Sequence, residues 1–262
     1  MASVLEKIAA DLRRCHEARE TRPPLRDELP DQRLESAYAV QEINTRHWLD
    51  AGRRLVGRKI GLTSKAVQEQ LGVDQPDYGM LFHDMACVDG EAIDTGRLLQ
   101  PKIEGEVAFM IGDDLDAGPL TSADVINAID WATAAFEIVD SRIADWKIGI
   151  LDTIADNASS GLFVLGTELH PLDGLDLRLC GAVLERFGEP VSVGAGAACL
   201  GNPLNAVLWL ARKMIEVGQP LRRGDLVLSG ALGPMVAVRP GDAFELRING
   251  LGSVRTSFTG GN

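Results

Sequence analysis

Apolar residues recur at helical spacing in two segments near the start of the chain: Leu5, Ile8, Ala9 and Leu12, and then Leu34, Ala37, Tyr38 and Trp48. Stripes of this kind are typical of amphipathic helices that bury one face. A Pro-Pro break separates the two segments, and Gly52 is a suitable end for the second helix. Neither stripe gathers residue types used in catalysis, so we expect a small helical N-terminal region over residues 1–54.

From residue 55 onwards the pattern changes to short apolar runs separated by Gly, Pro and Asn turns. These runs predict strands at residues 55–62, 86–88, 91–93, 100–111, 161–165, 180–193, 226–228, 235–238, 243–248 and 254–258, with a hairpin turn at Asp89-Gly90. Helices are predicted from Ser64 to Gly72 and over residues 121–136, 152–157 and 203–217. We therefore expect a mixed α/β core over residues 55–262, with a coiled, mostly antiparallel sheet or barrel flanked by helices.

The most informative strand is the one at residues 100–111, which reads Q-P-K-I-E-G-E-V-A-F-M-I. Its period-two alternation places Glu104 and Glu106 on one face and Ile103, Val107 and Phe109 on the other. Side chains two residues apart on a strand are separated by roughly 6.5 to 7 Å. Two carboxylates at that spacing repel each other in a buried site unless a proton or a cation compensates them.

A third acid, Glu137, closes the helix predicted over residues 121–136, which begins with a capping box at Thr121 and Asp124. Three carboxylates without histidine or cysteine suit a hard cation such as Mg²⁺ or Mn²⁺. Short motifs such as E-x-E often occur without function. On that motif alone, the acids are better explained as surface residues.

Composition excludes several classes of protein. The 262 residues are 45% hydrophobic and 24% charged, which is ordinary for a globular domain. A net charge of −12 argues against nucleic-acid binding. An anionic substrate would therefore need local positive charge, from a metal ion or from Lys59, Lys102 or Arg142. The chain has no apolar run of about 18 residues and no signal-peptide pattern at its start, so we expect a cytoplasmic protein that does not bind membranes.

Cysteine and histidine are scattered along the chain. The four cysteines form no C-x-x-C motif, so we expect reduced and mostly buried thiols: Cys15, Cys87, Cys180 and Cys199. The scattered histidines argue against a histidine-ligated metal. Two further polar residues have plain structural explanations: Lys59 as a lysine at a strand edge with its head in solvent, and Asp77 as an acid in the turn at residues 74–79.

Three stretches of sequence favour a functional explanation of these residues over a structural one. The sequences P-K-I-E-G-E at 101–106, E-I-V-D-S-R at 137–142 and A-D-N-A-S-S-G at 155–161 together resemble the fumarylacetoacetate hydrolase superfamily. The likeness runs from about Leu34 to the C-terminus. Within the superfamily the chain is most similar to the 2-hydroxypentadienoate (2-oxopent-4-enoate) hydratases, whose near relatives are the 4-oxalocrotonate decarboxylases.

The resemblance implies roles for individual residues. It implies that Glu104, Glu106 and Glu137 hold the metal, that Lys59 faces the substrate, and that Asp77 lies near the reacting carbons. Ser160 would hydrogen-bond the substrate carboxylate, and the loop containing Leu232 and Gly233 would border the substrate. It also implies a homo-oligomer.

The expected function is metal-dependent hydration of 2-hydroxypenta-2,4-dienoate, a small dienoic acid, to 4-hydroxy-2-oxopentanoate in the degradation of aromatic compounds. Decarboxylation of 4-oxalocrotonate is the first alternative, because it uses the same metal as an electron sink. The second is C–C hydrolysis of an acylpyruvate, although the chain shows no convincing histidine for the His-Glu dyad of the hydrolases. The third is a metal-binding protein without catalytic activity.

Overall fold

The computed structural model describes residues 3–65, 68–69 and 73–260. Two helices open the chain, α1 (Val4–Ala18) and α2 (Leu34–Asp50). Their predicted stripes are buried at Ile8, Ala9 and Leu12 in α1 and at Ala37 in α2, as the helical spacing predicts. Gly72, the predicted end of the helix after Ser64, lies outside the described residues.

The N-terminal helices share a hydrophobic cluster with α5 (Ile150–Ala155) and do not form a separate body. Val40 of α2 packs there with Ile143 and Ile154. Gln41 Nε2 donates to Tyr78 O at 2.9 Å and to Ile154 O at 3.0 Å, so α2 is bonded to β2 and to α5. The division of the chain at residue 54 stays a prediction.

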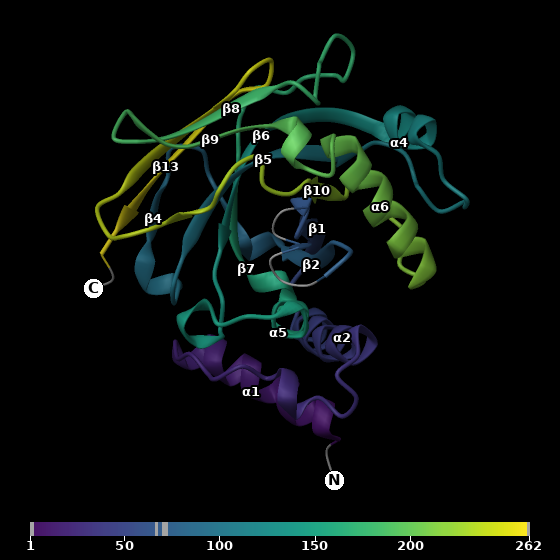
Figure 1. The fold of residues 1–262 in the computed structure, drawn as a ribbon, viewed down its shortest axis with the longest axis vertical. Helices are drawn as coiled ribbons and strands as arrows, with labels where there is room; N and C mark the ends of the chain where they lie inside the picture. Colours follow the sequence, from purple (N-terminus) through teal and green to yellow (C-terminus); the bar gives the residue numbers. More distant parts are fainter. Residues whose placement is uncertain (1–2, 66–67, 70–72, 261–262) are drawn as a thin grey trace.

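Two β-sheets form the rest of the fold (Figure 1). The larger sheet has the order β2 (Asp77–Phe82), β1 (Leu55–Gly61), β10 (Leu226–Leu228), β5 (Lys102–Ile111), β6 (Ile129–Val139), β7 (Ser160–Leu165) and β3 (Ala86–Cys87), with β11 (Val236–Ala237) also paired to β5. The smaller sheet has the order β4 (Ala92–Asp94), β13 (Gly252–Thr259), β12 (Ala243–Ile248), β8 (Gly181–Arg186) and β9 (Glu189–Ala195). Most pairs are antiparallel, which confirms the predicted mixed α/β fold with a coiled sheet.

Packing between the two sheets decides which way the acids of β5 point. A Cβ on Gly105 would lie 2.6 Å from Leu246 Cδ1, so β12 of the smaller sheet presses directly on β5. Because side chains alternate along a strand, Glu104 and Glu106 point away from that interface. They face the other side of the larger sheet.

The other helices lie beside the sheets. Helices α4 (Ser122–Ala128) and α6 (Pro203–Glu216) contact each other at the end of the molecule away from β4 (Figure 1). Asn202 caps α6 as predicted, by accepting from Leu204 N at 2.9 Å. Short 3₁₀ helices connect the elements: η1 (Arg26–Glu28), η2 (His83–Met85), η3 (Thr95–Arg97), η4 (Ala144–Trp146), η5 (Asn157–Ser159) and η6 (Gly196–Ala198).

The helix predicted over residues 121–136 is wrong beyond its first two turns. The capping box at Thr121 and Asp124 is present, but α4 ends at Ala128 and the chain continues as strand β6. β6 lies between β5 and β7 in the sheet, and its residues from Ala132 to Val139 are all buried. Its sequence therefore shows no polar alternation to mark a strand. The residues Ile129, Ala132 and Phe136 therefore fitted a helical period by chance.

The hairpin predicted at Asp89-Gly90 is also wrong in its pairing. The turn exists, with Gly90 at φ +79°, but the strands on its two sides do not pair with each other. β3 pairs with β7 in the larger sheet, and β4 pairs with β13 in the smaller one. The turn therefore carries the chain from one sheet to the other.

The prediction of buried, reduced cysteines is confirmed. All four cysteines are buried and free. No helix in the described part of the chain is long and apolar enough to cross a membrane.

Candidate metal centre and active site

The structure brings the three predicted carboxylates together. Glu104 on β5 lies directly opposite Glu137 on β6, and Glu106 follows two residues later on the same face of β5. One carboxylate oxygen from each residue lies within 4.8 Å of the others. The side chains are buried: Glu104 is 9%, Glu106 0% and Glu137 1% exposed. This burial excludes the explanation that they are surface acids.

The electrostatics of this cluster favour a cation. Burial, followed by the charge of Glu137, raises the pKa of Glu104 to about 7 and that of Glu106 well above its ordinary value. Burial likewise raises the pKa of Glu137. Both oxygens of Glu137, and Oε1 of Glu106, have no hydrogen-bond partner among the described residues. Unpartnered carboxylate oxygens converging in a buried site fit Mg²⁺ or Mn²⁺, which prefer oxygen ligands.

Lys59 lies beside the carboxylates, as expected, and is buried. Its Nζ is 3.0 Å from Glu137 Oε1 and donates to Ala158 O at 3.1 Å. The contact with Glu137 is an ion pair without hydrogen-bond geometry. Burial lowers the pKa of Lys59, but Glu137, Asp77 and the other two acids raise it by more, so the ammonium stays charged. The strand-edge explanation, with the head in solvent, is therefore wrong.

Asp77 is the first residue of β2 and not part of a turn, which corrects the prediction from composition. It pairs across the strands with Gly61, where a Cβ would lie 2.2 Å from Asp77 Oδ1. Neither carboxylate oxygen has a hydrogen-bond partner in the described part of the chain. Burial raises the pKa of Asp77 to about 6, although Lys59 lowers it. A carboxylate with that pKa is suited to exchanging protons near neutral pH.

The backbone that holds Lys59 was not predicted. The φ values of Asn157, Ala158 and Ser159 are 54°, 51° and 53°. Residues other than glycine rarely adopt this left-handed backbone conformation. The Asn157 side chain bonds both polar groups of Met80: Oδ1 accepts from Met80 N at 2.7 Å, and Nδ2 donates to Met80 O at 2.9 Å. This clamp directs Ala158 O at Lys59. Such strain is frequent at functional sites.

Ser160 follows this left-handed segment. Its Oγ donates to Asn157 O at 2.8 Å, and its own backbone oxygen accepts from Arg142 Nη1 at 3.1 Å. A Cβ on Gly79 would lie 2.4 Å from Asn157 O and 2.8 Å from Ser160 Oγ, so only glycine allows β2 to approach so closely. Ser160 is thus held at the same β2 surface as Asp77.

The loop after β10 contacts the metal centre through its backbone. Gly230 N, which sequence reasoning did not single out, donates to Glu106 Oε2 at 2.8 Å. Leu232 is buried, and its N–H donates to Gly105 O at 3.0 Å. Gly233 packs on β9, where a Cβ would lie 2.8 Å from Ser192 Oγ and 3.1 Å from Val193 O. The loop is therefore a packed wall next to β5.

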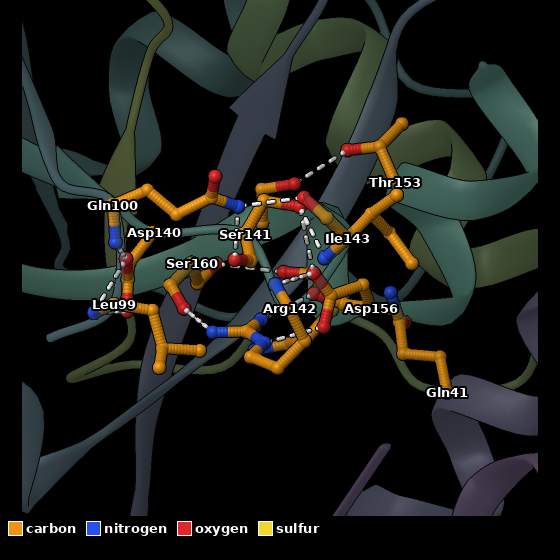
Figure 2. A network of polar contacts seen from close by, with 12 residues as sticks. Gln41, Leu99, Gln100, Asp140, Ser141, Arg142, Ile143, Thr153, Asp156 and Ser160 are labelled. Atoms are coloured by element: carbon orange, nitrogen blue, oxygen red, sulfur yellow. Dashed lines mark hydrogen bonds and ion pairs between the residues drawn. The ribbon is translucent and has the colours of Figure 1, made fainter. Parts of the chain in front are cut away.

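A buried ion pair between Arg142 and Asp156 holds the chain directly before the left-handed segment (Figure 2). Arg142 bonds Asp156 through its backbone N–H, its Nε and its Nη2, the last of these to Asp156 O at 2.7 Å. Asp140 accepts from Leu99 N and Gln100 N at 3.0 and 2.7 Å. Arg142 is therefore engaged in structure, and Lys59 is the cation next to the carboxylates.

The raised pKa values predict a pH-dependent effect of metal on stability. The acids keep protons in the folded protein at pH values where the unfolded chain releases them, so the metal-free protein should lose stability as pH rises from about 4.5 through 7. Mg²⁺ replaces those protons. We expect it to raise the melting temperature by at least about 4 °C at pH 7.5 and by less than half of that at pH 5. Thermal melting with Mg²⁺ or EDTA measures this, and equal shifts at both pH values would contradict it.

Comparison with known proteins agrees with the fold. Residues 51–259 match the family model described as "Fumarylacetoacetate (FAA) hydrolase C-terminal". A "TodF product hydratase" of Pseudomonas putida F1 is 63% identical over 90% of this chain and 88% of its own length. A "2-keto-4-pentenoate hydratase" of Paraburkholderia xenovorans LB400 is 57% identical over 97% of this chain and 94% of its own length.

A solved structure shows the same fold. It is a 4-oxalocrotonate decarboxylase from Pseudomonas putida G7, complexed with magnesium and adipate. It is 36% identical to this chain, covers 97% of both chains and superposes with a TM-score of 0.93. The family match spans well over half of the sequence. The chain therefore belongs to the fumarylacetoacetate hydrolase family.

Proposed function

We propose that this protein is a metal-dependent hydratase that converts 2-hydroxypenta-2,4-dienoate to 4-hydroxy-2-oxopentanoate. The observation that carries the proposal is the buried triad of Glu104, Glu106 and Glu137, with unpartnered oxygens, next to the charged Lys59. Relatives that are 57% and 63% identical are named as hydratases of this type. These names and the site chemistry support the same reaction.

Glu104, Glu106 and Glu137 are the proposed metal ligands. A bound Mg²⁺ or Mn²⁺ would act as a Lewis acid that polarises the carbonyl oxygen of a 2-oxo acid. The three glutamates fix its place on the rigid centre of the larger sheet. Lys59 neutralises part of their charge and adds a positive field for an anionic substrate, which the net charge of −12 otherwise repels.

Lys59 and Asp77 are the proposed proton movers. The dienol first loses its hydroxyl proton and gains a proton at C5, which gives 2-oxopent-3-enoate. Water then adds its oxygen to C4, and C3 takes a proton, so the sum is one water added. Asp77, with its pKa near 6, is ionised at neutral pH and can take the proton from water. Lys59 is protonated in the resting site, so it can donate a proton and stabilise the developing negative charge.

Ser160, Leu232 and Gly233 are the proposed substrate contacts. The Ser160 hydroxyl now donates to Asn157 O, so donating to a substrate carboxylate requires it to rotate about χ1. Leu232 and Gly233 belong to the apolar run G-A-L-G-P-M at 230–235. They suit the uncharged end of a dienoate. Assembly as a homo-oligomer and a place in aromatic degradation are proposed from the family resemblance alone.

The decarboxylase alternative shares the metal site and differs at the far end of the substrate. Its substrate carries a second carboxylate, and the 230–235 loop offers no cation to pair with it. An unpaired buried charge is costly. The hydrolase alternative needs a histidine beside a glutamate, and in the described part of the chain the polar contacts of the triad involve Lys59 and Gly230 N but no histidine.

Substrate specificity tests the proposal. We expect enzyme and Mg²⁺ to abolish the diene absorbance of 2-hydroxypenta-2,4-dienoate and to form 4-hydroxy-2-oxopentanoate, identified by mass spectrometry. With 2-oxo-3-hexenedioate we expect little CO₂, because the apolar loop cannot pair its second carboxylate. Efficient CO₂ release without hydration of the dienoate would favour the decarboxylase and leave the metal assignment intact. Turnover of neither acid, with the Mg²⁺ melting shift retained, would favour a metal-binding protein.

A further inference from the structure

A second cavity, with a volume of about 280 Å³, lies between the N-terminal helices and residues 140–162. Of the eight residues assigned to the candidate active site, only Ser160 is among the lining residues. The proposed hydration therefore uses only the Ser160 edge of this cavity and leaves the rest without a role. Its volume is just below the range of about 300 to 1,000 Å³ typical of ligand pockets, so it suits a small molecule.

Aromatic and aliphatic side chains form an apolar wall of the cavity. Trp48 and Phe82 meet edge to face, with ring centroids 5.7 Å apart, and both line the cavity. Leu12, Met85 and Leu162 complete this wall. Aromatic rings and aliphatic side chains in this arrangement favour a flat or conjugated ligand body.

Cationic side chains also line the cavity. Four arginines line the cavity: Arg19, Arg53, Arg97 and Arg142. A guanidinium has five N–H donors. Acceptors among the described residues account for three donors of Arg142 and two each of Arg53 and Arg97. Arg53 and Arg97 therefore retain donors for a ligand, whereas Arg142 is mainly engaged by Asp156 and Ser160.

The acids that line the cavity are already engaged. Asp84 accepts from Arg53 at 2.9 Å, Asp156 is paired with Arg142, and Asp140 accepts from Leu99 N and Gln100 N. Four arginines face three aspartates, so the lining has a net positive charge. The pKa of His16 agrees with this positive charge: burial, and then Arg142, Arg19 and Arg53, lower it to about 4.

We propose that this cavity is a second ligand site, which binds a small, flat organic anion such as an aromatic or conjugated carboxylate. The guanidinium of Arg53 lies 4.3 Å from the Phe82 ring centroid and 5.0 Å from that of Trp48. Positive charge and aromatic surface therefore lie next to each other in the lining. A carboxylate bound there would accept from the arginines while its apolar body lies on Trp48 and Phe82.

Benzoate is the probe, and isothermal titration calorimetry is the measurement. The protein is used with EDTA, so that a carboxylate cannot bind through a metal ion. We expect one benzoate per chain, weaker binding at higher salt, and at least about tenfold weaker binding of the neutral analogue benzyl alcohol. Binding should persist with Mg²⁺ and oxalate, which are expected to occupy the glutamate triad. Displacement by Mg²⁺ and oxalate, or equal binding of benzyl alcohol, would overturn the proposal.

Arginine variants locate the site. Arg53→Gln and Arg97→Gln should each weaken benzoate binding by at least about tenfold, the usual worth of a hydrogen bond to a charged group. Arg46→Gln is the matched control, because Arg46 lies on the same helix as Trp48, is 74% exposed along its side chain and does not line the cavity. Circular dichroism checks the fold of each variant. Unchanged binding in both folded cavity variants, or no binding of benzoate at 10 mM (about the weakest affinity the proposal allows), would show the proposal to be wrong.

Discussion

Glu106→Gln is expected to abolish Mg²⁺-dependent hydration while the protein remains folded. Glu106 is fully buried, and among the described residues only one of its carboxylate oxygens has a hydrogen-bond partner, Gly230 N. Removing one of three carboxylates weakens metal binding and with it several kcal/mol of transition-state stabilisation, so kcat/KM should fall by about 10³ or more. Glutamine keeps the shape and can keep the bond from Gly230. Steady-state loss of diene absorbance at saturating Mg²⁺ is the measurement.

The same variant should behave differently without metal. Burial and then the charges of Glu137 and Glu104 raise the pKa of Glu106, so a neutral amide at this position relieves both desolvation and repulsion. The metal-free variant should melt at a temperature equal to or above that of the metal-free wild type at pH 7.5, and added Mg²⁺ should no longer raise it. Glu245→Gln on β12, in the other sheet, is the control and should keep full activity. Wild-type turnover by Glu106→Gln would remove the triad from the metal site.

The acids of β5 were predictable because one face of this strand is apolar and packs on a second sheet. Alternation then fixes the faces of Glu104 and Glu106. Apolar residues at helical spacing likewise identified the two N-terminal helices and α6. The position of Glu137 could not be derived in this way. β6 is flanked by β5 and β7, so its burial depends on strands that are distant in sequence. Glu137 was singled out as a third acid at the end of a predicted helix, and that helix was wrong beyond Ala128; the resemblance then implied its place in the metal site.

Backbone groups of the site were also beyond sequence reasoning. Ala158 contributes only its carbonyl oxygen to Lys59, and no side-chain property marks such a role. The sole local signal was Asn157, since asparagine tolerates left-handed backbone better than most residues. Even so, the clamp on Met80 depends on a pairing across 77 positions. Gly61 was predicted in a strand and Gly79 in a turn, and neither role is apparent until the packing shows what a Cβ would strike.

Lys59→Met is expected to lower kcat/KM by on the order of 10² to 10⁴, the usual range for a group that takes part in proton transfer. Methionine fills similar space, so the buried site should stay packed. The variant leaves Glu137 and Asp77 without their neighbouring cation. Stopped-flow or steady-state decay of the dienoate, with Lys147→Met as an exposed control, measures the loss. A change of less than a few-fold would mean that Lys59 has no part in the chemistry.

The pH profile of this variant separates a chemical role from simple packing. If ionised Asp77 accepts the proton from water, activity should rise with pH through a limb near the Asp77 pKa of about 6. Lys59 lowers that pKa in the wild type. Removing the cation should therefore move the limb to higher pH, and the loss of activity should be larger at pH 6 than at pH 8. A uniform loss at every pH would leave Lys59 as a binding group and would remove Asp77 from proton transfer.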